Sequence, residues 1–311
     1  MNTLREGVED YLAVRRSLGF KLFDAGKGLL DFVSFLEQQD TSYVTTSLAL
    51  KWAQQPSSVQ PAEWARRLSY VRGFSRYRSA TDSRTEIPSW GLLPHRPRRA
   101  KPYLYKDKEI RHLLEAALSL SPAGSLRPRT YYCLFGLLAV SGLRISEARC
   151  LKTEDVDLSE GVLTVRGAKF GKSRLVPLHA SSKKVLSDYK CHRDRFLAGR
   201  PAPSFFVSHQ RGSRLDGAEV RRTFYMLSRQ IGLRDLASSH GPRLHDFRHR
   251  FAVETLLQWY KSGEDVERRL PVLSTYLGHV HVSDTYWYLT ACPELMGQAL
   301  SRLEKRWEAQ S

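Results

Sequence analysis

The sequence predicts a mainly α-helical protein with one small β-sheet, divided into two domains. Apolar residues recur every three or four positions through most of the chain, which is the period of an amphipathic helix. Two short runs, 161–166 and 173–178, are rich in β-branched and apolar residues and predict a pair of strands around a short turn. The length of 311 residues exceeds what a single hydrophobic core usually serves, so two domains are expected.

Residues 1–80 predict a bundle of four short helices. Each has an apolar face, and each begins at a residue that favours a helix start. The spans or start signals are, in chain order, Leu4–Leu18, Asp24, Thr45 or Thr46, and Pro61.

Residues 81–103 predict a linker. Three prolines between positions 94 and 102 prevent a helix, and four basic residues crowd into the same stretch. An ordinary hydrated tether has no need of that charge density, so we expect contacts with phosphates. The residues concerned are Arg96, Arg98, Arg99 and Lys101.

Residues 104–311 predict a second domain that mixes helices with short strands. Helices are expected at Leu104–Leu120, Arg127–Ser141, Ser181–Leu197, Glu219–Ile231, Leu244–Trp259, Asp265–Leu277 and Pro293–Trp307. Phe205–Ser208 is a candidate for one more short strand.

Charge and composition limit the function. Lys and Arg number 49 against 32 Asp and Glu, and this excess of +17 favours a polyanionic partner over a merely soluble basic protein. No apolar run approaches the roughly twenty residues of a membrane span, and the N-terminus lacks a signal-peptide layout, so we expect a cytoplasmic protein. Four scattered cysteines without a CxxC pattern argue against a zinc site or a disulfide framework.

Three short segments of the second domain carry candidate chemistry. Ser141–Glu147 reads SGLRISE, which places Arg144 at a helix start, where free backbone N–H groups favour an anion. Residues 244–251 read LHDFRHRF, which puts His245 and Arg248 on one helical face. Residues 277–279 read LGH, and a tyrosine follows nine positions later. Each motif alone is usually structural.

Together these segments resemble the tyrosine recombinase family, also called phage integrases. That family has an arginine in an SGLR-x-x-E turn, a lysine in a β-turn, H-x-L-R, LGH, and a tyrosine about nine residues later. All five blocks occur here in that order, with Ala168–Leu178 as the β-turn block. The resemblance covers residues 103–290. It implies an N-terminal four-helix core-binding (SAM-like) domain and a mixed α+β catalytic domain at 104–311.

The resemblance also implies the roles of the site residues. Arg144 and Arg248 would clamp the scissile phosphate, with Glu147 supporting Arg144. Lys169 would protonate the leaving 5′ oxygen, and Tyr288 would be the nucleophile. The remaining implied positions are His245 for proton transfer, His279 for a hydrogen bond to a phosphate oxygen, and Lys172 and Arg174 as DNA contacts.

Some positions have competitors. Tyr286 lies two residues before Tyr288, so on a helix the two side chains project about 200° apart and only one can face the phosphate. Lys172 competes with Lys169 for the catalytic place, and Phe170 stands where the β-turn often has glycine. Arg250, beside the clamp, could add a phosphate contact.

The resemblance implies a site-specific DNA recombinase that needs no metal, ATP or other cofactor. We expect double-stranded DNA as its partner, a dimer on one site, a tetramer in synapsis, and a bacterial, nucleoid-associated location. The alternatives are relaxation of supercoils by a type IB topoisomerase-like enzyme and silent DNA binding. Phage integration, transposition, cassette exchange and chromosome resolution all remain open as biological roles.

The C-terminal segment 292–311 predicts a helix with an apolar stripe. Its members are Leu295, Ala299, Leu303 and Trp307, spaced by four. The stripe could pack on its own domain or dock into a neighbouring subunit.

Overall fold

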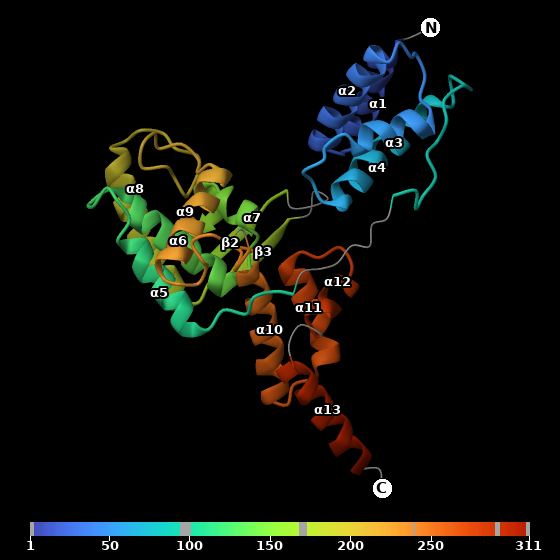
Figure 1. Cartoon of the computed structure of the whole chain (residues 1–311). Helices are drawn as coiled ribbons and strands as arrows, with labels where there is room; N and C mark the ends of the chain where they lie inside the picture. The colour runs from blue at the N-terminus through green and yellow to red at the C-terminus, as the bar shows by residue number, and fades with distance from the viewer. Residues whose placement is uncertain (1–2, 94–100, 168–172, 239, 290–292, 309–311) are drawn as a thin grey trace. The chain divides into compact units, whose positions relative to one another are not determined.

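A computed structural model describes residues 3–93, 101–167, 173–238, 240–289 and 293–308 (Figure 1). It is mostly helical with one small sheet, as predicted, and this antiparallel sheet has a third strand that the sequence pattern did not predict. The chain divides into two compact units, residues 1–100 and 101–311. No helix in the described parts is long and apolar enough to cross a membrane.

The first unit is a bundle of four helices. These are α1 (Leu4–Ser17), α2 (Phe23–Gln38), α3 (Thr46–Gln54) and α4 (Pro61–Arg78). Their apolar faces enclose a core that includes Phe32, Trp52 and Phe74. Thr45 caps α3 by accepting a hydrogen bond from the backbone N–H of Leu48, as predicted.

The predicted cap of the second helix is wrong. Helix α2 begins at Phe23, with Leu22 as its N-cap in the left-handed region. Asp24 therefore lies in the first turn, where a carboxylate still interacts favourably with the helix dipole but does not mark the start.

The first part of the predicted linker packs against the bundle. The backbone N–H of Glu86 donates to the carbonyl of Val44 (2.8 Å), and Arg72 Nε donates to the carbonyl of Pro88 (2.7 Å). Asp82 and Thr85 are buried. Residues 81–93 thus belong to the first unit, and the division between the units falls after Ala100.

The described residues of the second unit form nine helices and one small sheet. The helices are α5 (Asp107–Leu118), α6 (Leu126–Ser141), α7 (Ile145–Arg149), α8 (Ala180–Leu197), α9 (Gly217–Gln230), α10 (Asp246–Lys261), α11 (Val266–Leu277), α12 (Ser283–Leu289) and α13 (Pro293–Glu308). A 3₁₀ turn, Thr153–Asp155, leads into the sheet, whose strands are β1 (Val156–Asp157), β2 (Val162–Val165) and β3 (Arg174–Pro177). β2 pairs with β3 from Val162 opposite Pro177 to Val165 opposite Arg174.

Phe205–Ser208 is not a strand, contrary to the prediction. Nearby backbone pairing is limited to isolated bridges, Lys152 with Ser204 and Val207 with Arg214. The two phenylalanines are buried in the main core instead. A short apolar run can be either a paired strand or a buried segment without strand pairing. Its composition reflects burial, which is common to both.

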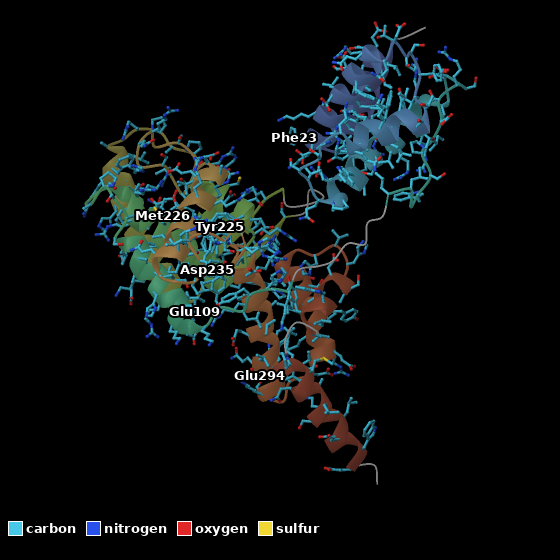
Figure 2. All side chains as sticks on the ribbon, viewed as in Figure 1. Phe23, Glu109, Tyr225, Met226, Asp235 and Glu294 are labelled. Carbon is cyan, nitrogen blue, oxygen red and sulfur yellow. The ribbon has the colours of Figure 1, made fainter. Side chains whose placement is uncertain are left out.

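The C-terminal helices build a second core within this unit. It joins residues of α10, α11 and α12 with Leu295 at the start of α13. Glu294, labelled on α13 in Figure 2, pairs with Lys261 at the end of α10 (3.0 Å). The beginning of α13 therefore packs on its own unit.

Candidate active site

Turns and helix starts of the second unit bring the predicted residues together. Arg144 directly precedes α7, and His245 directly precedes α10, with Arg248 in the first turn of that helix. His279 follows α11, and Tyr288 lies on α12. Segments more than a hundred residues apart thus supply one site.

Arg144 is held by an acid and by a backbone turn. Its Nη1 donates to Glu147 Oε1 (2.8 Å), and its Nη2 donates to the carbonyl of Gly278 (3.2 Å). The Arg144 backbone N–H donates to the other oxygen of Glu147 (2.9 Å). One carboxylate therefore both begins α7 and orients the guanidinium.

Arg248 is 1% exposed and donates to two backbone carbonyls. Its Nη1 bonds to Gly142 (3.0 Å) and its Nη2 to Leu277 (2.6 Å). The carbonyl of Leu277 also accepts a hydrogen bond from Nη1 of Arg144 (3.5 Å), so the two guanidinium groups are neighbours. Burial lowers the pKa of Arg248 to about 10, partly opposed by Tyr288, and the side chain stays charged at neutral pH.

Both glycines of these turns are required by the geometry. Gly142 ends α6 with φ of 60°, and a Cβ there would lie 2.6 Å from the ring of Phe251. Gly278 ends α11 with φ of 69°, and a Cβ there would lie 2.8 Å from Nη1 of Arg174. The glycines of SGLR and LGH therefore serve the left-handed backbone and the close packing of the site.

The two candidate nucleophiles have different surroundings. Tyr286 is 53% exposed, whereas Tyr288 is 3% exposed. The ring of Tyr288 stacks on His279, with centroids 5.9 Å apart. The geometry favours Tyr288.

Three histidines surround Tyr288 and the arginines. Burial and then the charges of Arg248 and Arg144 lower the pKa of His279 to about 4, so its imidazole is neutral at pH 7. The pKa of His245 is also lowered, first by desolvation and then by Arg248. His249 packs edge-on between the rings of His245 (4.7 Å) and Tyr288 (5.4 Å).

Thr285 is a site residue that sequence reasoning missed. Its hydroxyl lies 2.7 Å from Nδ1 of His279, and the side chain is fully buried. The available signal was its position six residues after the LGH histidine and three before Tyr288. This contact orients the imidazole and fixes which nitrogen can face a phosphate.

Arg174 and Arg250 lie elsewhere than expected. Arg174 was expected to contact DNA, but its guanidinium bonds to both oxygens of Glu147 (2.8 and 3.1 Å) and to the carbonyl of Tyr276 (2.6 Å). Arg250 bonds to the carbonyl of Tyr105 (2.8 Å) and pairs with Asp107, so it anchors α10.

Several predicted residues lie outside the described residues. These are Lys169, Lys172, Arg96, Arg98 and Arg99. Lys101 is described and exposed.

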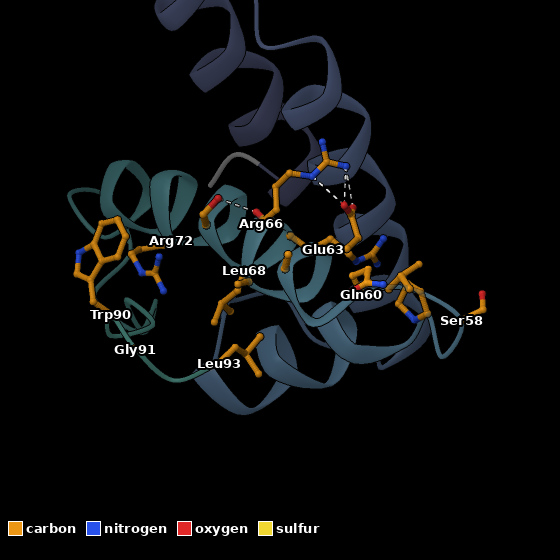
Figure 3. Close-up of a pocket in the computed structure, with 15 residues that line it drawn as sticks. Ser58, Gln60, Glu63, Arg66, Leu68, Arg72, Trp90, Gly91 and Leu93 are labelled. Atoms are coloured by element: carbon orange, nitrogen blue, oxygen red, sulfur yellow. Dashed lines mark hydrogen bonds and ion pairs between the residues drawn. The ribbon is translucent and has the colours of Figure 1, made fainter. Parts of the chain in front are cut away.

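A groove of about 1020 Å³ runs along α4 in the first unit (Figure 3). Arg72 and the exposed Trp90 line it, with the guanidinium 4.3 Å from the ring centroid. Arg66 and Glu63, which also line it, form an ion pair (2.8 Å). None of the predicted site residues lines this groove.

Comparisons with known proteins identify the family of this chain. The family described as phage integrase matches residues 104–294. A Sinorhizobium fredii protein that carries an integrase/recombinase name, y4rB, is 58% identical over 99% of both chains. The tyrosine recombinase XerD of Caulobacter vibrioides is 32% identical over 74% of this chain and 71% of its own. The fold is similar to that of the Tn1549 transposon integrase bound to transposon right-end DNA, with a TM-score of 0.65, 15% identity, and coverage of 98% of this chain and 99% of that one. The chain therefore belongs to the phage integrase family of tyrosine recombinases.

Proposed function

We propose that this chain is a site-specific DNA recombinase that cuts one strand through Tyr288. The observation that carries the proposal is the meeting of a buried tyrosine with two fixed arginines and a neutral histidine. The phenol oxygen attacks the scissile phosphorus and the bond to the 5′ oxygen breaks, which leaves a 3′-phosphotyrosine and a free 5′-hydroxyl. The 5′-hydroxyl of a partner strand then reverses the step on the new duplex.

Arg144 and Arg248 are the proposed phosphate clamp. Attack builds negative charge on the nonbridging oxygens, and planar guanidinium groups bind such oxygens with paired donors. Their supports are carbonyls and one carboxylate, which use only part of each guanidinium's five donors. Preorganised donors of this kind contribute several kcal/mol to a transition state. In this scheme the arginines supply the positive charge and the phosphotyrosine conserves the bond energy, so neither metal nor ATP is required.

His245 and Lys169 are the proposed proton carriers, and His279 is the proposed hydrogen-bond donor to the phosphate. The phenol of Tyr288 must lose a proton during attack, and the lowered pKa of His245 leaves that imidazole neutral and able to assist. If the Thr285 hydroxyl donates a hydrogen bond to Nδ1 of His279, the proton of this neutral imidazole lies on Nε2. That Nε2–H group can then donate to a phosphate oxygen. Lys169 is the proposed acid for the leaving 5′ oxygen, by family resemblance alone.

Double-stranded DNA is the proposed partner. Support comes from the net charge of +17 and from the transposon-end DNA to which the structurally similar Tn1549 integrase is bound. We assign the basic residues of the predicted linker, with Lys172, to phosphate contacts. A dimer on one site, a tetramer in synapsis and a nucleoid-associated location complete the proposal.

A duplex with a nick beside the cleavage point tests the nucleophile. The short strand released on attack diffuses away, so the covalent protein–DNA adduct accumulates. We expect the wild type to form it in the presence of a metal chelator and Tyr288→Phe to form none. Tyr286→Phe is the matched control and should form it normally, since that side chain is exposed. An adduct that persists in Tyr288→Phe would contradict the assignment.

Relaxation of supercoils by the same chemistry is the rival activity. The names of the similar proteins, an integrase/recombinase and a XerD recombinase, favour recombination. A two-site recombination assay run beside a supercoil-relaxation assay separates the two. Relaxation without strand exchange would favour the rival.

A further inference from the structure

We propose that Arg174 is a positioning residue that holds Arg144 in its phosphate-binding pose through Glu147. The inference rests on the proposed role of Arg144 at the scissile phosphate. It gives Arg174 a place in the reaction without contact to DNA.

The carboxylate of Glu147 is shared by the two arginines. Arg174 Nη2 bonds to Oε2 (2.8 Å) and Nη1 to Oε1 (3.1 Å), which is a bidentate pair. Arg144 bonds to the same two oxygens, through its Nη1 and its backbone N–H. Because the bidentate pair fixes the plane of the carboxylate, it also fixes the direction in which that carboxylate holds Arg144.

Arg174 also braces the second support of Arg144. Its Nε donates to the carbonyl of Tyr276 (2.6 Å), in the last turn of α11. The next two carbonyls, of Leu277 and Gly278, accept hydrogen bonds from the guanidinium of Arg144. Gly278 packs directly on Arg174, and any larger residue there would collide with the Nη1 group. Both anchors of Arg144 therefore depend on one guanidinium.

The position of Arg174 in the chain connects this network to the sheet. It is the first residue of β3, opposite Val165 at the end of β2. The hairpin is thereby tied to the helix start that bears Arg144 and to the turn that bears His279. Three segments that supply proposed catalytic groups meet at one buried ion pair.

Because the Arg174–Glu147 ion pair is buried, Arg174 cannot easily leave it to contact DNA. The side chains of Arg174 and Glu147 are 9% and 6% exposed. Burial alone would raise the pKa of Glu147, but the bonds to Arg174 and Arg144 outweigh it and lower that pKa to about 2, so the carboxylate stays charged. Moving Arg174 to a phosphate would leave a buried carboxylate with a single partner, which is strongly unfavourable.

Arg174→Lys tests the inference. A lysine keeps the positive charge but cannot bind both carboxylate oxygens and the Tyr276 carbonyl in one plane. We expect adduct formation on the nicked duplex to slow on the order of 100-fold, as small misplacements of catalytic groups do. Arg193→Lys is the matched control: Arg193, on α8 and outside the site, is also buried and bonds to the Ala202 carbonyl (2.9 Å). That control should slow cleavage by less than about threefold.

A neutral phosphate analogue separates positioning from general damage. A methylphosphonate at the cleavage point removes one nonbridging charge, so it relies less on the guanidinium of Arg144. If Arg174 acts through Arg144, the loss in Arg174→Lys should shrink to less than about tenfold on this substrate. An equal loss on both substrates, or cleavage at the wild-type rate, would overturn the inference while Tyr288 chemistry stands.

Binding measurements distinguish positioning from a DNA contact. If Arg174 acts only through Arg144, adding Arg174→Lys or Arg174→Gln to Arg144→Ala should leave the Kd for an intact site and its salt dependence unchanged. A salt slope further reduced by about one when Arg174→Gln is added to Arg144→Ala would identify a phosphate contact of Arg174 itself and overturn the inference. Failure of the wild type itself to form an adduct would instead overturn the assigned function, and this inference with it.

Discussion

At the scale of single residues, the site holds two charged arginines, and neither forms a one-to-one ion pair with a carboxylate. Arg248 is buried, yet its partners are the carbonyls of Gly142 and Leu277, which carry partial rather than full negative charge. Only Arg144 shares a carboxylate, and that carboxylate is divided between two guanidinium groups. The network thus retains positive charge for a phosphate, whereas one-to-one ion pairs would have neutralised it.

His279 should make the stability of the protein depend on pH. Its folded pKa of about 4 lies below the usual value near 6.5, so between these values the unfolded chain binds more protons. The contribution of His279 to stability is therefore fully present above about pH 6.5 and is lost as the pH drops toward 4. Because the imidazole is partly exposed to solvent, which screens its interactions, we expect a loss of about 1 to 2 kcal/mol. Urea unfolding at several pH values should show a shallower decline in His279→Gln than in the wild type. His281→Gln, at an exposed neighbour, is the control, and identical profiles for all three proteins would contradict the burial of a neutral imidazole.

The sequence could identify site residues more readily than their partners. Motif order and spacing predicted Arg144, His245, Arg248, His279 and Tyr288, and the fold places them in one unit. For Arg174, the family resemblance implied a DNA contact. Its pairing with Glu147, 27 residues away, depends on a tertiary contact that no local pattern encodes.

At the scale of elements, helix starts and ends were predictable where side-chain chemistry fixes them. Thr45 and Pro61 begin helices as predicted, and the seven helices predicted for the second unit begin and end within a few residues of expectation. The short helices α7 and α12 had no predicted bounds. The seven residues of α12 are rich in aromatic side chains and show too little periodicity to define a helix. Its geometry comes from packing on α10 and α11.

Gly142 offers a test of how the turn before Arg144 is built. Gly142→Ala places a Cβ in a left-handed backbone and 2.6 Å from the ring of Phe251. We expect a loss of about 2 to 4 kcal/mol in the free energy of unfolding, from backbone strain and overpacking together. Gly124→Ala is the matched control, because Gly124 also has positive φ but a Cβ added to it would meet nothing within 4 Å. That variant should lose only about 1 kcal/mol. Equal losses in urea unfolding would show that packing at Gly142 is unimportant.

At the scale of the whole molecule, two surface properties extend beyond the catalytic site. The excess of +17 is a general attraction for a polyanion, of which the proposed catalytic arginines use a small part. The second property is apolar. On α13 the predicted stripe divides, since Leu295 is buried in the core formed with α10, Ala299 is half-buried, and Leu303 and Trp307 are exposed. Met296 and Leu300, on the same helix, are exposed as well. An apolar face of this kind suits contact with a second copy of the chain.

The exposed end of α13 should therefore control assembly rather than folding. Leu300→Ser combined with Leu303→Ser removes apolar surface that is solvent-exposed in the single chain, so thermal stability should change little. In gel shifts, binding of one protomer to a half-site should be unchanged, whereas cooperative binding of the second should weaken by about tenfold or more, equivalent to about 1.4 kcal/mol. Glu304→Gln, an exposed change on the same helix, is the control. Undiminished cooperativity in the double variant would assign this helix to its own unit alone, because a surface that docks into a neighbour cannot lose two exposed leucines without cost.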